Sequence, residues 1–342
     1  MRTGSPGEPL ALAIVLALAI GGSLLTSCGG DSGDADVDSD VDTDSDTDSD
    51  TDFSFDVERI YDDVAYLASD ELAGRYPGSD GNEQALLHVE ALFEELGLDP
   101  AGEDGTYRQP FTYSSTSGPI DTVNLLAMAP GTDPQLGDEV IMMGAHIDHL
   151  GVDGSDIYNG ADDNASGTAV LMELARALTA LVPEPRRTVV FASWNAEEQG
   201  LLGSCYYVEH PLIDLQDTIG KISIDMEGTG DGTGLVLWGG TGEGHRWFGE
   251  VMKGSAKERD LEHQVFLSGD AGRSDHVCFA EQGVPAVLAS AMCIDIEQCY
   301  CCYHTPEDTI DTISKPSLQA SVELLWAFLE PVAQGEEAKY LE

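Results

Sequence analysis

The sequence predicts an α/β protein with three layers, α/β/α, around a central, mostly parallel, mixed and twisted sheet in a single domain. Short β-prone apolar runs alternate with helical patterns from residue 53 onward. Two of these runs, 139–146 and 187–194, lack clean polar alternation, which is typical of central strands covered on both faces. The stretch between them, 165–181, has a strong helical pattern, so the three form a β-α-β unit.

The other elements follow from the same patterns. A helix is predicted over 82–98, because its apolar residues recur at helical spacing and Gly97 follows as a stop. Further strands are predicted at 122–128, 221–225, 234–238 and 284–290, and further helices at 244–258 and 317–332. We find neither an internal repeat nor a second domain in this region.

The first residues have a different composition. "LALAIVLALAIGGSLLTSC" is an apolar run that Gly21 and Gly22 interrupt. Its end, Leu-Thr-Ser-Cys28, resembles the bacterial lipobox, so we predict a lipoprotein signal peptide over 1–27 and lipid on Cys28, which attaches the protein to a membrane. An ordinary secretory signal and a retained helix are the alternatives. We expect an exported cell-envelope lipoprotein, at the outer membrane or the cell surface, with release from the cell left open.

Residues 28–52 are predicted to be a disordered linker between the lipid and a folded domain over 53–342. The stretch 31–52 holds eleven Asp and no Lys or Arg, so it cannot bury a core. Its D-x-D spacing leaves weak calcium binding open. Removing these eleven charges from the formal net charge of −48 leaves −37. Such an acidic protein is a poor partner for nucleic acid, so we expect none.

The seven cysteines indicate disulfides. If Cys28 carries lipid, six remain, and an even count in an exported chain favours disulfide pairing. The spacing of the cluster near residue 300 is too tight for a zinc knuckle. We expect disulfides at Cys293, Cys299, Cys301 and Cys302, with Cys205 and Cys278 as candidate partners.

Polar residues follow several predicted strands, at the edge where α/β sheets bind ligands. A helix cap or a surface hydrogen bond would explain any one of them. Together they would bring two histidines and several carboxylates from five segments to one rim, which is ligand chemistry for two divalent ions such as zinc. The segments are 146–149, 162–163, 197–198, Asp225 and His304.

This ligand chemistry suggests a reaction. A carboxylate that bridges two metals holds them about 3.5–4 Å apart around a shared water. A second carboxylate, which is not a ligand, must take the proton from that water and return it to the leaving amine. Glu197 and Glu198 suit this division, because neighbouring side chains diverge.

The chain resembles the di-zinc exopeptidases, a family that includes bacterial leucyl-type aminopeptidases, glutamate carboxypeptidase and the glutaminyl cyclases. The similarity covers roughly residues 55–330, and its motifs occur in the family's order. They are "LASDELAGRYPGSDGNEQA", "GAHIDHLG", "GADDNASG", "FASWNAEEQGLLGS", "IDMEG", "SDHVCF…GVPAV" and "YHTPEDT".

The resemblance implies a set of metal ligands. His146 and Asp225 would hold one zinc ion, and Glu198 and His304 would hold the other. Asp163 would bridge the two ions, because it stands just before "NASG" where the family has its bridging residue, and Asp162 does not. His149 and His276 stay outside this set, because five ligands already complete the site.

The resemblance also implies catalytic roles. Glu197 would be the general acid and base. Asp148 would orient the first histidine ligand. Tyr303, just before the last ligand, would donate a hydrogen bond to the developing oxyanion, as a tyrosine does in some relatives.

The function that follows is a lipid-anchored zinc metallo-aminopeptidase with two co-catalytic Zn²⁺, acting as a monomer on peptides with a free N-terminus. A carboxypeptidase or dipeptidase would need a cation for a terminal carboxylate, for which Arg75, Arg246 and Arg273 are the candidates. A glutaminyl cyclase uses one zinc, whereas this sequence keeps every ligand for two. An inactive surface binding module would have lost Glu197 or a ligand.

Overall fold

The computed structural model describes residues 53–230, 232–269, 272–293 and 302–341. The predicted signal peptide and linker, together with Cys299 and Cys301, lie outside the described residues. Asp50–Glu342 forms one unit of the chain. None of the described helices has the length and apolar character needed to cross a membrane.

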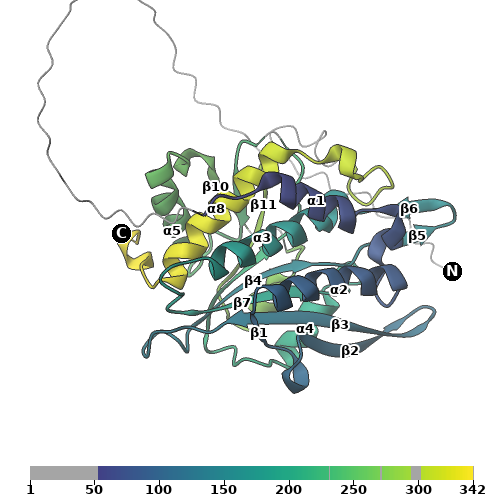
Figure 1. Ribbon diagram of the computed structural model, residues 1–342, viewed down its shortest axis with the longest axis horizontal. Helices are drawn as coiled ribbons and strands as arrows, with labels where there is room; N and C mark the ends of the chain where they lie inside the picture. The colour runs from purple at the N-terminus through teal and green to yellow at the C-terminus, as the bar shows by residue number, and fades with distance from the viewer. Residues whose placement is uncertain (1–52, 231, 270–271, 294–301, 342) are drawn as a thin grey trace, which may run out of the picture. The chain divides into compact units, whose positions relative to one another are not determined.

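A nine-stranded mixed sheet forms the middle layer (Figure 1). Its strands are β1 (Asp99–Pro100), β2 (Arg108–Ser115), β3 (Gly118–Ala129), β4 (Val140–His146), β7 (Thr188–Trp194), β8 (Thr218–Ile224), β9 (Leu235–Trp238), β10 (Val265–Ser268) and β11 (Ala286–Ala291). They follow the order β1-β3-β7-β4-β8-β11-β9-β10, with β2 paired to β3. The central strands β7, β4, β8 and β11 are parallel, whereas β3 with β7 and β11 with β9 pair antiparallel. The predicted mixed sheet is therefore confirmed.

Helices cover both faces of the sheet (Figure 1). One face is covered by α1 (Val57–Leu67), α2 (Asp80–Glu95), α3 (Gly167–Thr179), α5 (Arg246–Ala256) and α8 (Lys315–Ala333). The other is covered by α4 (Leu202–Glu209) and α6 (His276–Glu281). A small separate hairpin joins β5 (Gly151–Asp153) to β6 (Asp156–Tyr158).

The two central strands predicted from their unbroken apolar runs are buried along their whole length. Every residue of β4 and of β7 is buried. Successive side chains enter different cores: Met143 and Phe191 pack under α3, whereas Met142 and Val190 pack on the side of α4 and α6. The unit β4-α3-β7 has parallel strands, as the sequence predicts.

The structure also contains elements that the sequence analysis did not assign. They include α1, α4, α6, β2 and β10, most of them short. For α1 the sequence does carry a start signal, because the Asp56 carboxylate accepts hydrogen bonds from the amides of Glu58 and Arg59. The helix predicted to begin at residue 165 begins at Gly167 instead, because the preceding residues form a separate turn.

The sequence left the pairing of the cysteines open, with Cys205 and Cys278 as candidate partners for the cluster near residue 300. Cys205 and Cys278 form a disulfide with each other, not with the cluster near residue 300. The reason is geometric: α4 and α6 pack side by side on one face of the sheet, which brings the two Cα atoms to 5.1 Å. Cys293 is also disulfide-bonded, in agreement with the prediction for that residue.

Removing the disulfide between α4 and α6 should lower the stability of the fold and leave zinc binding unchanged. A Cys205→Ala, Cys278→Ala double variant is expected to lose about 2–4 kcal/mol of unfolding free energy, because the bond closes a long loop of the unfolded chain. Guanidinium denaturation of both proteins measures the difference, and zinc content serves as the control. An unchanged denaturation midpoint would show that the bond does not stabilise the fold.

Candidate metal centre

Five segments at one edge of the sheet carry the predicted metal ligands. His146 is the last residue of β4, and Asp225 directly follows β8. Glu198 lies in the loop after β7, Asp163 lies in the turn before α3, and His304 lies in the segment between β11 and α8. Because the parallel strands end side by side at this edge, residues far apart in the sequence meet there.

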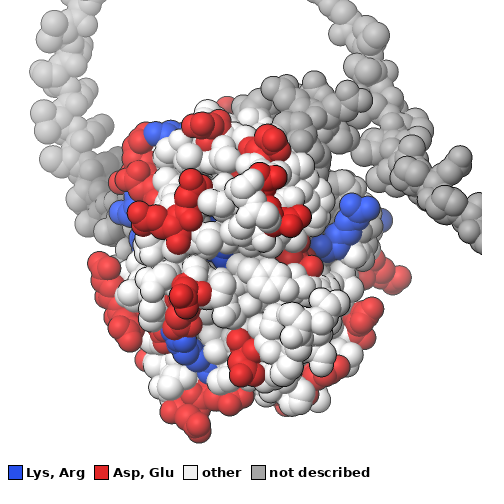
Figure 2. Space-filling view, turned by 90° about the vertical axis from the view of Figure 1, so that its right-hand side faces the viewer, with Lys and Arg blue, Asp and Glu red and all other residues white. Residues whose placement is uncertain are grey.

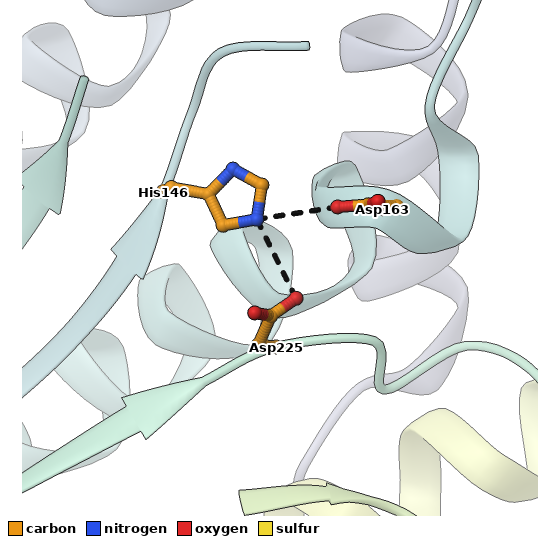
Figure 3. Close-up of side chains that lie close together, drawn as sticks. All are labelled: His146, Asp163 and Asp225. Carbon is orange, nitrogen blue, oxygen red and sulfur yellow. Dashed lines mark ion pairs between the residues drawn. The ribbon is translucent and has the colours of Figure 1, made fainter. Parts of the chain in front are cut away.

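His146, Asp163 and Asp225 form one half of the site (Figure 3). The Nε2 atom of His146 lies 3.2 Å from Asp163 Oδ1 and 3.4 Å from Asp225 Oδ1. Its Nδ1 atom lies 3.2 Å from the backbone carbonyl of Asp148. A carbonyl oxygen only accepts hydrogen bonds, so Nδ1 carries a proton and Nε2 is the atom that can bind a metal.

Asp163 turns its second carboxylate oxygen toward the other half of the site. The Nε2 atom of His304 lies 3.1 Å from Asp163 Oδ2 and 3.0 Å from Glu198 Oε2. Asp163 therefore faces His146 through one oxygen and His304 through the other. This is the placement that a carboxylate needs to bridge two metal ions.

The Asp308 carboxylate holds the turn that carries Asp163. The Asp308 side chain accepts hydrogen bonds from the backbone amides of Asp162 (2.9 Å) and Asp163 (3.1 Å). The Asp162 side chain points elsewhere, because it accepts hydrogen bonds from the amides of Gly228 (2.7 Å) and Thr229 (3.0 Å). Asp308 was not predicted from the sequence, although it stands in the motif "YHTPED", four residues after His304.

His149 lies in the second half of the site, although it was not among the ligands predicted from the sequence. Its ring is fully buried, and its Nδ1 atom lies 2.7 Å from Glu198 Oε1. Together with Asp163 and Glu198 it forms a group that could hold a metal ion. His276 belongs to no such group among the described residues; it is buried at the start of α6.

The two adjacent glutamates have different surroundings. Glu198 contacts two histidines, whereas Glu197 belongs to neither metal-binding group of the described residues. Burial raises the pKa of Glu197 well above its ordinary value, and the nearby Asp275 and Asp225 carboxylates add to the increase despite His146. A carboxyl group with a raised pKa is suited to exchange protons near neutral pH.

Asp148 fixes the turn that carries both glutamates. Its carboxylate accepts hydrogen bonds from the backbone amides of Glu197 (3.1 Å) and Glu198 (3.3 Å). The nearest carboxylate oxygen lies 3.8 Å from His146 Nδ1, farther than the backbone carbonyl of the same residue. Asp148 thus faces the histidine mainly through its backbone, and the glutamates through its side chain.

Replacing Asp148 by asparagine should weaken the site. One of the two acceptor oxygens becomes an NH₂ group that faces a backbone N–H, so the turn with Glu197 and Glu198 loses a hydrogen bond. We expect kcat/KM or zinc affinity to fall by about 10–100-fold. The exposed Asp153→Asn variant is the matched control. Wild-type values for both quantities in the Asp148 variant would contradict this role.

Tyr303 lies at the rim of the second half. Its ring stacks on that of His304 with centroids 3.8 Å apart, and the residue is 39% exposed. Burial of the phenol and the surrounding carboxylates, Asp163 first among them, raise the pKa of Tyr303 above its ordinary value. The hydroxyl therefore keeps its proton and can donate it in a hydrogen bond.

The donor set fits two zinc ions. Its carboxylates favour positive charge: hydrogen bonds to Asp163 and Glu198 raise the pKa of His304 to about 10. Burial opposes a charged His146, yet neighbouring carboxylates raise its pKa well above the ordinary value. Zinc readily takes this mixture of imidazole nitrogen and carboxylate oxygen. Two divalent ions would also balance four clustered carboxylates, namely Asp163, Glu197, Glu198 and Asp225.

Comparisons with known proteins find similar sequences among peptidases. The model of Peptidase family M28 matches residues 124–329. Aminopeptidase YwaD of Bacillus subtilis is 32% identical over 201 residues, which cover 58% of this chain and 42% of that protein. This chain therefore spans less than half the length of that relative.

Solved structures show the same fold. BSAP, a zinc aminopeptidase from Bacillus subtilis, has a TM-score of 0.67 at 20% identity, covering 82% of this chain and 95% of that one. The glutaminyl cyclase of Porphyromonas gingivalis has a TM-score of 0.66 at 19% identity, covering 81% of this chain and 99% of that one. At these identities the likeness is one of fold.

Proposed function

The chain belongs to peptidase family M28, and from this premise we propose that it is a zinc aminopeptidase that removes residues from the free amino end of peptides. The main support for the proposal is the position of Asp163 between two groups of candidate metal ligands. One of its oxygens faces His146 and the other faces His304. Glu197 lies beside these groups and belongs to neither of them among the described residues. The arrangement suits metal-assisted hydrolysis of a carbonyl compound.

Each half of the site would hold one zinc ion. His146 and Asp225 would bind the first, Glu198 and His304 would bind the second, and Asp163 would bind both. When bound, the ions would polarise the scissile carbonyl and lower the pKa of the attacking water. His149 would fix one oxygen of Glu198 through its Nδ1 atom and leave the other directed at the site.

Glu197 would move the proton. It would accept the proton from the attacking water and deliver it to the amine that leaves. Asp148 supports this role, because its carboxylate binds the backbone amide of Glu197 and so fixes the start of the side chain. The Tyr303 hydroxyl, which keeps its proton, would donate a hydrogen bond to the oxygen that becomes negative.

The charges around the site favour an aminopeptidase over a carboxypeptidase. Arg75, one of the arginines considered as an anchor for a carboxylate, is buried and donates to four backbone carbonyls instead. Figure 2 shows acidic residues spread over the side of the molecule that carries the β5–β6 hairpin, with few basic ones among them. Such a surface attracts an ammonium group and repels a carboxylate.

The direction of cleavage tests the proposal. Zinc-loaded protein is given leucyl-p-nitroanilide, the same compound with an acetylated amine, and a tripeptide with an amidated carboxyl end. We expect turnover of the first and third compounds and none of the second. Cleavage that requires a free carboxyl end would indicate a carboxypeptidase instead. Cyclisation of a glutaminyl peptide without hydrolysis would indicate a glutaminyl cyclase, and no turnover across a panel of amino-acid anilides would overturn the proposal.

We also propose that the protein is exported and held at the cell envelope by lipid on Cys28. The support is the apolar run that ends in Leu-Thr-Ser-Cys28 and the acidic linker after it. Metabolic labelling with a palmitate analogue should mark the wild-type protein and not a Cys28→Ser variant. Equal labelling of both proteins, or of neither, would contradict the anchor.

A further inference from the structure

Arg75 is a buried arginine that takes no part in the proposed reaction. It ends the short segment Asp70–Arg75 between α1 and α2, and only 1% of its surface is exposed. Its guanidinium group donates hydrogen bonds to four backbone carbonyls and not to a carboxylate. The acceptors are Leu67 (2.5 Å), Asn159 (2.6 Å), Ile147 (2.9 Å) and Gly160 (2.9 Å).

Two of the segments that Arg75 binds lead directly to metal ligands. Ile147 follows His146, and Gly160 lies three residues before Asp163. The planar guanidinium group therefore ties the end of β4 to the turn that carries the bridging carboxylate. A fork of N–H donors fixed in one plane sets the relative position of such carbonyls, which a flexible ammonium group cannot do.

The backbone of Arg75 reaches the third loop of the site. Its carbonyl accepts hydrogen bonds from the His149 amide (3.4 Å) and from the side chain of Asn82 (3.1 Å). Asn82 in turn accepts a hydrogen bond from the side chain of Asn195 (2.9 Å), two residues before Glu197. One residue is thus connected to the segments of His146, Asp163 and Glu197.

The loops around Arg75 pack too closely to shift relative to one another without clashes. A Cβ atom on Gly160, whose φ is +59°, would lie 2.3 Å from the Asp163 carbonyl oxygen and 2.5 Å from the His149 ring. A Cβ atom on Gly74, whose φ is +69°, would lie 2.4 Å from the carbonyl oxygens of both Gly151 and Tyr158. The loops around the guanidinium group therefore pack in direct backbone contact.

The charge of Arg75 also acts on the site. Burial lowers the pKa of Arg75 to about 10, so the group stays cationic at neutral pH. The carboxylates of Asp308, Asp148, Asp163 and Glu198 are close enough to favour its charged form. The cation is therefore attracted both to Asp163 and Glu198, two expected ligands, and to Asp148 and Asp308, whose side chains hold the turns that carry the ligands.

We propose that Arg75 is a positioning residue of the metal centre, which holds the His146 and Asp163 segments at the separation that two bridged metal ions require. This role rests on the proposed function, because it presupposes metal in the site. Arg75 itself touches neither substrate nor metal in this role, and it is not an anchor for a substrate carboxylate.

Arg75→Lys tests the role, with Arg187→Lys as the matched control. Arg187 is also a buried arginine, 5% exposed, but it binds Val332, Glu139 and Glu337 away from the site. Zinc affinity is measured by competition with a chromogenic chelator, the visible spectrum of the cobalt-substituted protein reports ligand geometry, and thermal unfolding reports stability. We expect Arg75→Lys to bind zinc about 10–100-fold more weakly with an altered cobalt spectrum. Arg187→Lys should lose stability but keep wild-type affinity and spectrum.

Other outcomes would overturn the role. Wild-type zinc affinity and an unchanged cobalt spectrum in Arg75→Lys would show that the four hydrogen bonds do not position the ligands. A variant that stays unfolded with and without saturating zinc would show that Arg75 stabilises the fold instead. Wild-type protein that binds no zinc would contradict the proposed function, and the inference with it. Equal affinities together with equal cobalt spectra in wild type and variant would contradict the inference alone.

Discussion

Replacing Glu197 by glutamine is expected to lower kcat by about 10²–10⁴-fold while zinc content stays at the wild-type level. Glutamine keeps the size and polarity of the side chain but cannot take up and return a proton. Because Glu197 belongs to neither metal-binding group of the described residues, its replacement leaves the ligands in place. The measurement is kcat for leucyl-p-nitroanilide, with zinc per chain determined by mass spectrometry on the same samples.

The neighbouring glutamate provides the matched control. Glu198 lies 2.7 Å from His149 Nδ1 and 3.0 Å from His304 Nε2, so Glu198→Gln should lose zinc together with activity. The two variants therefore separate proton transfer from metal binding at adjacent positions. A Glu197→Gln variant with near-normal kcat, or one that has lost its zinc, would refute the assignment of Glu197 as the base.

Replacing Asp163 by asparagine is expected to remove both metal ions. Asp163 contributes one carboxylate oxygen to each half of the site, 3.2 Å from His146 Nε2 and 3.1 Å from His304 Nε2. Asparagine can offer only its single carbonyl oxygen as a ligand, and it adds no negative charge between two cations. Zinc content after dialysis should fall from two ions per chain to nearly none, and activity should fall with it.

Asp162→Asn is the control for this change, because the adjacent carboxylate is equally buried but binds the amides of Gly228 and Thr229. We expect it to retain both zinc ions with some loss of stability. Asp225→Asn should chiefly affect the ion held with His146, since Asp225 contacts that half of the site. Two zinc ions per chain in Asp163→Asn would show that this residue does not bridge them.

Much of the fold could be predicted from the sequence, because the central elements leave strong patterns. β4 and β7 are buried on both faces and therefore appear as unbroken apolar runs. The short helix α6 does not repeat its apolar pattern often enough to be recognised. The partner of Cys205 could not be predicted, because the packing of α4 against α6 decides it.

The sequence indicates which residues gather at the candidate site better than it indicates the hydrogen bonds that each of them makes. Motifs mark which side chains gather at the strand ends, and the structure brings all five expected ligands together. Motifs do not show from which groups a carboxylate accepts hydrogen bonds. The bonds of Asp148 to two backbone amides, and those of Asp308 to the turn of Asp163, involve main-chain donors that every residue possesses. His149 was set aside by counting ligands, which takes no account of residues that orient a ligand.

The central claim is that this chain needs two zinc ions, held through Asp163, to remove the first residue of a peptide. The most direct test is the titration of zinc-free protein with zinc while it acts on leucyl-p-nitroanilide. We expect no turnover by the zinc-free protein and a rise in activity that reaches its plateau at two zinc ions per chain. Full turnover without zinc, or none with zinc in excess, would contradict it.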